Sequence, residues 1–360
     1  MGANAASRSF VVDLKAHRIV WGWRDGLALA RELEHNGIRR FMLVASSRRA
    51  EQFSTLIGSE IVARRSGIFA DIIAHVPQHC VDAACEAASR CDADALVVFG
   101  GGSAFDTAKA VGHRIGLPII AIPTNFSGSE VTWNYGLTVG GSKRTMREPS
   151  VLPRAVIYEP SLAETMTLSI AVCSGINAIA HAIEALYAPE ANLLTQSLAE
   201  AGIASMVAGL REWAEMGFSA QAGTSCLQGA WLCGEALSQV GMGLHHRICH
   251  VLGGTYGLPH AATHTLMLPY LISFNVPYAL ALSRLDDLFD GAPFAKSLAD
   301  FATTHGAPVS LASLGLPEQE IARVASLALD TPVANPRPIT TLDLEVLLTR
   351  AWRGELAETH

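Results

Sequence analysis

The stretch Ala95-Leu96-Val97-Val98-Phe99-Gly100-Gly101-Gly102-Ser103 decides the fold class of this chain. Its first five residues are apolar and predict a buried strand, and the run 104–114 that follows has the pattern of a helix. The glycines between them allow backbone amides to approach a phosphate, and the helix N-terminus adds a partial positive charge. Gly100, Gly101, Gly102 and Ser103 therefore indicate a pyrophosphate site, although a tight turn alone also favours glycine.

The same alternation of strand and helix patterns extends on both sides of this stretch. Further short apolar runs predict strands at 18–21, 40–45, 119–122 and 155–158, and helical patterns cover 27–36, 48–56 and 80–90. After Pro160 the segments 161–210 and 223–241 are rich in Ala, Leu, Met and Glu, which favour helices. The sequence therefore predicts an α/β dinucleotide-binding domain at 1–160, a parallel sheet with flanking helices, and an all-α domain at 161–360.

Composition narrows the class of protein further. Half of the 360 residues are hydrophobic and 16% are charged, which is typical of a globular protein with a large core. The net charge of -7 gives no support to nucleic-acid binding. The seven cysteines contain no CxxC pair, and residues 1–8 lack an apolar signal core. We therefore expect a cytoplasmic protein that acts on a small molecule, without nucleic acid or membrane as partners.

A second loop with binding chemistry follows the predicted strand 119–122. It carries hydroxyl and amide groups that can bind ribose, phosphate or a nicotinamide carboxamide, at Thr124, Asn125, Phe126 and Ser129. The GxGxxG fingerprint is absent after the first predicted strand, where the chain reads Gly22-Trp23-Arg24-Asp25-Gly26. The sequence thus predicts a nucleotide site that differs from the ordinary Rossmann type.

The end of the second predicted strand bears on the choice of cofactor. Ser46 and Ser47 stand where an acidic residue would select the ribose 2'-hydroxyl, and Arg48 and Arg49 follow them. The two arginines either accommodate a 2'-phosphate or form only the solvated first turn of the next helix. We expect both NADH and NADPH to serve as cofactor.

Five of the 13 histidines fall between residues 245 and 264. His246 and His250 are four positions apart and share one helix face, and the breaks at 253–254 and 257–259 return the chain so that His260 approaches them. Asn177 and His181 share a face of an earlier predicted helix. We expect these five side chains to converge on one site, and His245 and His264 to be surface or core histidines without a catalytic role.

Residue 177 decides whether this site is a metal site. A carboxylate at 177 together with His181, His246 and His260 would suit a divalent transition metal. Asn177 is a neutral and weaker ligand, so the site is predicted to need no metal. The alternative is that Asn177 still binds iron or zinc through its carbonyl oxygen.

These motifs together resemble the iron-containing alcohol dehydrogenase superfamily, which has the dehydroquinate synthase-like fold. The resemblance is carried by Gly100-Gly101-Gly102-Ser103 with Ala108-Lys109, by 127–132, by the helix of Asn177 and His181, and by His246, His250 and His260. Within the superfamily the chain is more similar to the maleylacetate reductases, through 75–77, 123–130, 151–154, 175–181, 244–246 and 334–338. The resemblance implies an active site in the cleft between the two domains, and a homodimer.

The resemblance also implies a reaction. A nicotinamide hydride adds to the activated C=C of maleylacetate, and the enolate is protonated to 3-oxoadipate. The proton donor is expected to be His250, with His246 next, and the enolate is expected to be stabilised by His181, His260 and Asn177. The substrate-binding residues expected from the resemblance are Asn134, Tyr135, Lys143 and Arg337.

Two other functions stay open at this point. Asn134 and Tyr135 look more like the metal-dependent alcohol dehydrogenases, as does Asp106, which favours an alcohol or aldehyde oxidoreductase. Asn125 and Phe126 stand where maleylacetate reductases typically have Thr and Tyr. The third function is that of a nucleotide-binding protein whose redox chemistry has been lost or redirected, which the intact set of histidines opposes.

Overall fold

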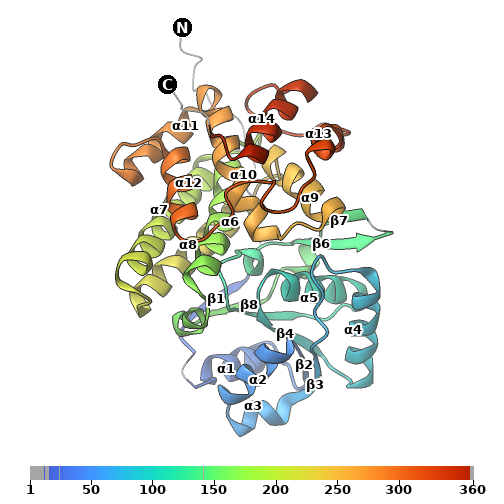
Figure 1. Ribbon diagram of the computed structural model, residues 1–360. Helices are drawn as coiled ribbons and strands as arrows, with labels where there is room; N and C mark the ends of the chain where they lie inside the picture. Colours follow the sequence, from blue (N-terminus) through green and yellow to red (C-terminus); the bar gives the residue numbers. More distant parts are fainter. Residues whose placement is uncertain (1–11, 13–15, 24, 141, 357–360) are drawn as a thin grey trace.

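The computed structural model describes residues 12, 16–23, 25–140 and 142–356 (Figure 1). A six-stranded parallel sheet with flanking helices forms the N-terminal half, and the chain after it is mainly helical. Figure 1 shows the sheet in the lower part of the view and the helical half above it. The predicted fold class is confirmed.

The central sheet is built from strands that are apolar along their length. β4 (Ala95–Gly100) is buried throughout, as expected for a parallel strand covered on both faces. Gly100 on β4 pairs with Pro123 on β5, so the turns that follow the two strands lie next to each other at the carboxyl ends of the strands. From edge to edge the strands are β1 (Arg18–Trp21), β8 (Ala155–Tyr158), β5 (Ile119–Pro123), β4, β2 (Phe41–Val44) and β3 (Arg65–Phe69).

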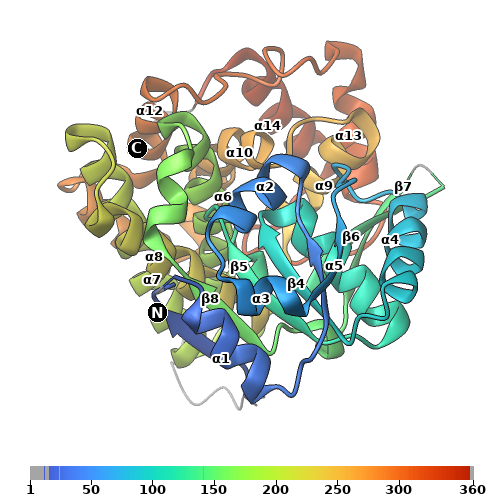
Figure 2. The same cartoon turned by 90° about the horizontal axis from the view of Figure 1, so that it is seen from below.

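Alternate side chains of these strands enter two separate cores. Val97 and Phe99 belong to the core under α1 (Leu27–His35), α2 (Ser47–Thr55) and α3 (Ser59–Arg64). Leu96 and Val98 belong to the larger core that includes α4 (Gln78–Arg90) and α5 (Gly102–Ile115). Figure 2, viewed from below, shows α1 and α3 in front of the strands. Because both faces of these strands are buried, their sequences are continuous apolar runs.

Three strands were not predicted from the sequence. β3 begins with Arg65-Ser66-Gly67 at the sheet edge, so it lacks an apolar run. β6 (Asn134–Val139) and β7 (Ser142–Arg147) form a separate antiparallel hairpin, and β7 is mostly polar. β3 and β7 have so few apolar residues that they do not give a buried-strand pattern.

The helical half is arranged around α6 (Leu168–Tyr187), which is buried over most of its length. It contacts α7 (Leu193–Met216), α8 (Ala220–Ser238) and α10 (His260–Asn275). α6 and α7 are long and apolar enough to cross a membrane by length and composition, yet 78% of the apolar window of α6 is buried inside the protein. The other helices are α9 (Leu244–Tyr256), α11 (Leu280–Ser283), α12 (Phe294–Thr304), α13 (Ile321–Ala328) and α14 (Thr341–Arg353), and short 3-10 helices lie at Ser129–Val131, Pro149–Val151, Pro160–Thr165, Val276–Tyr278, Arg284–Phe289 and Glu318–Glu320.

Glycines let α7 and α8 approach each other closely. A Cβ added to Gly229 on α8 would lie 2.7 Å from the backbone nitrogen of Met206 on α7. A Cβ added to Gly202 would lie 2.9 Å from the backbone nitrogen of Cys233. Because the facing atoms are backbone, the helices would have to separate to admit a side chain.

The substitution Gly229→Ala is therefore expected to destabilise the fold. The free energy of unfolding should fall by about 1–3 kcal/mol, after allowance for the higher helix propensity of Ala. Gly241→Ala is the matched control, because its added Cβ would meet only the Glu190 carboxylate at 3.9 Å. Urea unfolding of both variants measures the difference. Equal stability of the two would contradict this account of the contact between α7 and α8.

Candidate active site

A cavity of about 490 Å³ is lined by residues from both halves of the chain. The nucleotide-binding half contributes the start of α5, the loop before β6 and the hairpin, and the helical half contributes α6, α8, α9 and the start of α10. Its polar lining is His75, Ser103, Asp106, Ser127, Ser129, Thr132, Asn134, Tyr135, Thr145, Asn177, His181, His246, His250 and His260. Nearly all of the predicted catalytic groups therefore face one space.

The glycine turn after β4 is open toward this cavity. α5 begins at Gly102, which lines the cavity, and a Cβ added there would meet no atom within 4 Å. A Cβ on Gly101 would instead lie 2.3 Å from Nδ2 of Asn125. The open space at the N-terminus of a 14-residue helix fits a pyrophosphate, and Gly101 makes room for the neighbouring loop.

The loop after β5 is tied to this turn through its backbone. The Thr124 N–H donates to the Gly100 carbonyl at 2.9 Å, and Asn125 Oδ1 accepts from the Ser127 N–H at 3.3 Å. Phe126 was expected to contact the cofactor, but its ring lies in the core, 6.2 Å from the ring of Trp213. A fully buried aromatic ring stabilises the loop and cannot reach the cavity.

Ser46 and Ser47 lie at the start of α2, at the same edge of the sheet as the glycine turn. Both residues are exposed, and neither lines the cavity. Arg49 Nη1 donates to Thr165 Oγ1 at 2.9 Å. Their role in recognising the nucleotide stays a prediction.

Lys109 is a buried cation beneath the cavity wall. Its Nζ contacts the Ser129 carbonyl at 2.6 Å, Ser129 Oγ at 3.2 Å, Thr132 Oγ1 at 3.2 Å and the Asn134 carbonyl at 2.8 Å. Burial lowers the pKa of Lys109 to about 8. The ammonium group holds the segment 129–134 against α5. From the sequence, Lys109 was identified only as part of a family motif, and this structural role was not predicted.

Glu130 lies next to this cation in the interior. The Tyr158 hydroxyl donates to Glu130 Oε1 at 2.9 Å, whereas Oε2 has no partner among the described residues. Burial raises the pKa of Glu130 to about 7. The carboxyl group is therefore largely protonated below neutral pH.

The predicted histidine cluster forms at the helical side of the cavity. The rings of His181 on α6 and His246 on α9 are stacked with centroids 5.1 Å apart. His250 is 5.9 Å from His246 and 6.3 Å from His260, which begins α10. Burial, and then the neighbouring imidazoles, lower the pKa of His181 well below its usual value, so this ring is neutral.

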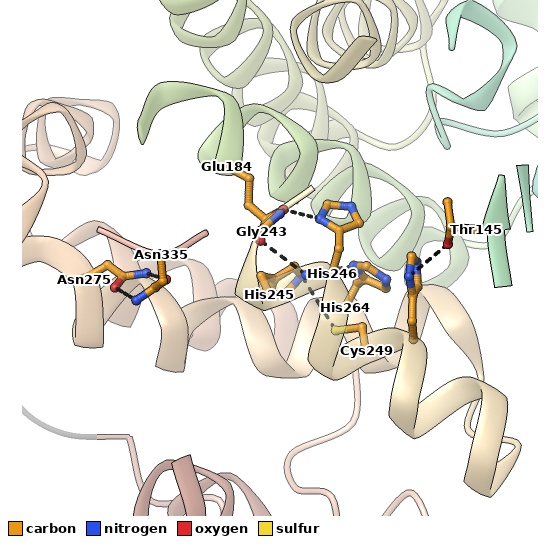
Figure 3. A network of polar contacts seen from close by, with 10 residues as sticks. Thr145, Glu184, Gly243, His245, His246, Cys249, His264, Asn275 and Asn335 are labelled. Atoms are coloured by element: carbon orange, nitrogen blue, oxygen red, sulfur yellow. Dashed lines mark hydrogen bonds and ion pairs between the residues drawn. The ribbon is translucent and has the colours of Figure 1, made fainter. Parts of the chain in front are cut away.

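A carboxylate fixes the tautomer of His246 (Figure 3). Glu184 Oε2 lies 2.7 Å from His246 Nδ1 and accepts the Gly243 N–H at 2.7 Å. Burial opposes the charge on Glu184, but the charge and hydrogen bond of His246 lower the pKa of this carboxyl below its usual value. Because Glu184 is ionised, Nδ1 of His246 carries a proton and Nε2 faces the cavity. Glu184 was missed, although the spacing 177, 181 and 184 places it on the same face of the helix.

Three buried polar atoms in the cavity wall have no partner among the described residues. They are Asn177 Oδ1, His181 Nδ1 and His246 Nε2. Buried polar atoms are normally paired, so their lack of a partner points to a ligand at this position.

The donor set fits a dication poorly. Asn177, His181, His246 and His260 bring no formal negative charge to the site. Within the described chain, His245, Cys249 and His264 form a group whose ligand atoms lie within 4.8 Å of one another, and this group is buried outside the cavity lining. His245 Nε2 and His264 Nδ1 are hydrogen-bonded at 3.0 Å, and burial lowers the pKa of His245 to about 3.

The predicted substrate residues are placed unevenly. Asn134 and Tyr135 line the cavity. Lys143 lies on β7 opposite Thr138, and its side chain is outside what the structure describes. Arg337 does not line the cavity: its guanidinium lies 4.1 Å from the Phe274 ring centroid and donates to the Phe274 carbonyl at 3.3 Å. The end of α10 thus holds Arg337 away from the site.

Comparison with known proteins identifies the family. The family model "Iron-containing alcohol dehydrogenase" matches residues 16–160, and the model "Fe-containing alcohol dehydrogenase family, C-terminal" matches residues 171–352. The chain belongs to the iron-containing alcohol dehydrogenase family. This membership confirms the resemblance and makes the protein an oxidoreductase.

Within the family the chain is similar to maleylacetate reductases over nearly its full length. It is 39% identical to maleylacetate reductase 1 of Cupriavidus pinatubonensis, over 96% of this chain and 98% of that one. It is 40% identical to the maleylacetate reductase of Pseudomonas knackmussii, over 96% and 98%. The crystal structure of maleylacetate reductase from Agrobacterium tumefaciens superposes with a TM-score of 0.90 at 36% identity, covering 98% of this chain and 100% of that chain.

Replacement of Glu130 tests whether the pKa of its buried carboxyl group is raised. Glu130 in the native protein, with a pKa of about 7, keeps a proton that the unfolded chain releases above about pH 4.5. The native state therefore loses stability from this group as pH rises from 4.5 to 7, by on the order of 3 kcal/mol. Glu130→Gln keeps the acceptor for Tyr158 and has no proton to lose. Urea unfolding across this range should show the extra slope only in the wild type, and parallel curves would refute the assignment.

Proposed function

We propose that the enzyme reduces the activated C=C of maleylacetate, or of a related 4-oxo-2-enoate, with NADH or NADPH and without a metal. The observation that carries this proposal is the donor set of the cavity, in which neutral Asn177 and three histidines stand beside the open glycine turn. The names of the relatives at about 40% identity support the same substrate.

The residues of the chain divide the reaction between them. When bound, the reduced nicotinamide supplies the hydride that adds to the C=C. Negative charge then develops on the ketone oxygen of the substrate, and His181, His260 and the Asn177 amide stabilise it by hydrogen bonding. Neutral donors suffice here, because the ketone already activates the double bond.

His250 then protonates the enolate carbon. It lines the cavity, and its Nδ1 lies 3.2 Å from Thr145 Oγ1 on β7, which orients the ring. His246 is the second choice, and its proton on Nδ1 is already engaged by Glu184. A general acid next to the enolate completes the addition of one hydride and one proton.

A metal-dependent alcohol or aldehyde oxidoreductase is the second candidate. The observation that favours it is the pair of His246 and Glu184, since metal-binding imidazoles are commonly held by a carboxylate on the other ring nitrogen. The lost carboxylate at residue 177 opposes it. A nucleotide-binding protein without redox activity is opposed by the complete histidine cluster. We further propose that the enzyme is a cytoplasmic homodimer.

Chelation separates the two enzymatic functions. Protein stripped with a chelator is expected to keep its activity on maleylacetate, and added iron or zinc should not raise it. His250→Ala should lower kcat about 100-fold or more, as expected for a lost general acid. Stoichiometric metal in elemental analysis, with metal-dependent reduction of simple aldehydes and no turnover of maleylacetate, would establish the second candidate instead.

The choice of cofactor is tested by steady-state kinetics. Because Ser46 and Ser47 stand at the end of β2 without an acid, kcat/KM for NADH and NADPH should agree within about a hundredfold, or roughly 3 kcal/mol. Strict selection of NADH would show that the discriminating residue lies elsewhere.

A further inference from the structure

The described cavity lining lacks the cationic side chains that a dicarboxylate substrate would be expected to bind. Maleylacetate carries two carboxylates, yet the described lining contains no lysine or arginine. Lys109 lies beneath the wall, with its ammonium engaged by Ser129, Thr132 and Asn134. The lining also contains five imidazoles, at His75, His181, His246, His250 and His260.

Four of these imidazoles already have a part in the proposed reaction, and His75 does not. It lies between β3 and α4, in the nucleotide-binding half. The other four all belong to the helical half, so His75 faces them from the opposite side of the cleft.

The backbone at His75 is held in a costly conformation. His75 has φ of 60° and Val76 has φ of 44°. A β-branched residue rarely adopts the left-handed region, so the turn is strained at Val76. Thr138 on β6 holds the turn, because its Oγ1 donates to the His75 carbonyl at 2.7 Å and its N–H donates to the Val76 carbonyl at 3.0 Å.

This conformation brings the His75 ring to the last turn of α9. A Cβ added to Gly253 would lie 3.4 Å from His75 Cε1 and 3.9 Å from His75 Nδ1. Gly253 follows His250 by three residues, so the two share a helix face. The His75 ring therefore lies next to Gly253, on the helix that also carries the proposed proton donor.

We propose that His75 binds a carboxylate of the substrate and thereby sets the preference for an anionic enone. This inference rests on the proposed function and names the residue that recognises its substrate class. Strained backbone persists where the surrounding structure fixes it, and here the turn fixes an imidazole in a cavity whose described lining has no lysine or arginine. Thr138 acts through His75 and is a positioning residue.

The test is steady-state kinetics with maleylacetate on the full-length enzyme. His75→Ala should raise KM about 10- to 100-fold, the range for a lost hydrogen bond to a charged group, while kcat changes little. His75→Gln keeps a hydrogen-bond donor and should recover part of the loss. Thr138→Val should raise KM by a smaller factor. His79→Gln, an exposed imidazole four residues away, is the matched control and should behave as wild type.

Binding measurements separate this inference from the proposed function. The dissociation constants of 3-oxoadipate and of 4-oxopentanoate, which lacks one carboxylate, are measured calorimetrically with NAD+ bound. Weaker binding of either acid to His75→Ala, with unchanged affinity for NADH and an unchanged melting temperature, supports the inference. Unchanged KM and unchanged binding of both acids overturn it, as does an equal loss of NADH affinity. A wild type that fails to reduce maleylacetate overturns the proposed function, and the binding results then decide whether His75 recognises carboxylates.

Discussion

The buried ammonium group of Lys109 fixes the segment on which most of the cavity wall depends. A buried cation must be fully hydrogen-bonded, and the oxygens that satisfy it belong to Ser129, Thr132 and Asn134. β6 begins at Asn134, so the position of the hairpin follows from this contact. Through the hairpin, Thr138 reaches His75 and Thr145 reaches His250. One interior cation thus organises two imidazoles that come from different halves of the chain.

Two charged groups of the interior, Glu184 and Lys109, lie behind the cavity lining. Glu184 and Lys109 are buried and bonded, and each orients neighbouring groups that do reach the cavity. The polar groups that line the cavity are hydroxyls, amides and imidazoles, with Asp106 on α5. A wall of this kind stabilises developing charge by hydrogen bonds without holding a fixed countercharge in the resting enzyme.

Much of the fold could be predicted from the sequence, because β4 and β5 are buried on both faces and read as continuous apolar runs. The histidine cluster was also predictable, since His246 and His250 share a helical face and glycines mark the turn to His260. The rest depended on tertiary structure. Whether Phe126 enters the core or the cavity, and whether Arg337 turns toward Phe274, is decided by packing partners distant in sequence. β7 gave no pattern, because a polar strand has no apolar periodicity, and His75 was noted only as part of the family motif 75–77 because nothing in the sequence shows a strained turn.

The hairpin of β6 and β7 has a consequence for how this family member can diversify. It forms its own two-stranded sheet, outside the register of the six parallel strands. It nevertheless supplies Asn134, Tyr135 and Thr145 to the cavity. Mutations in the hairpin can therefore reshape the substrate pocket while the scaffold that binds the nucleotide is conserved, so natural selection can act on the two functions separately.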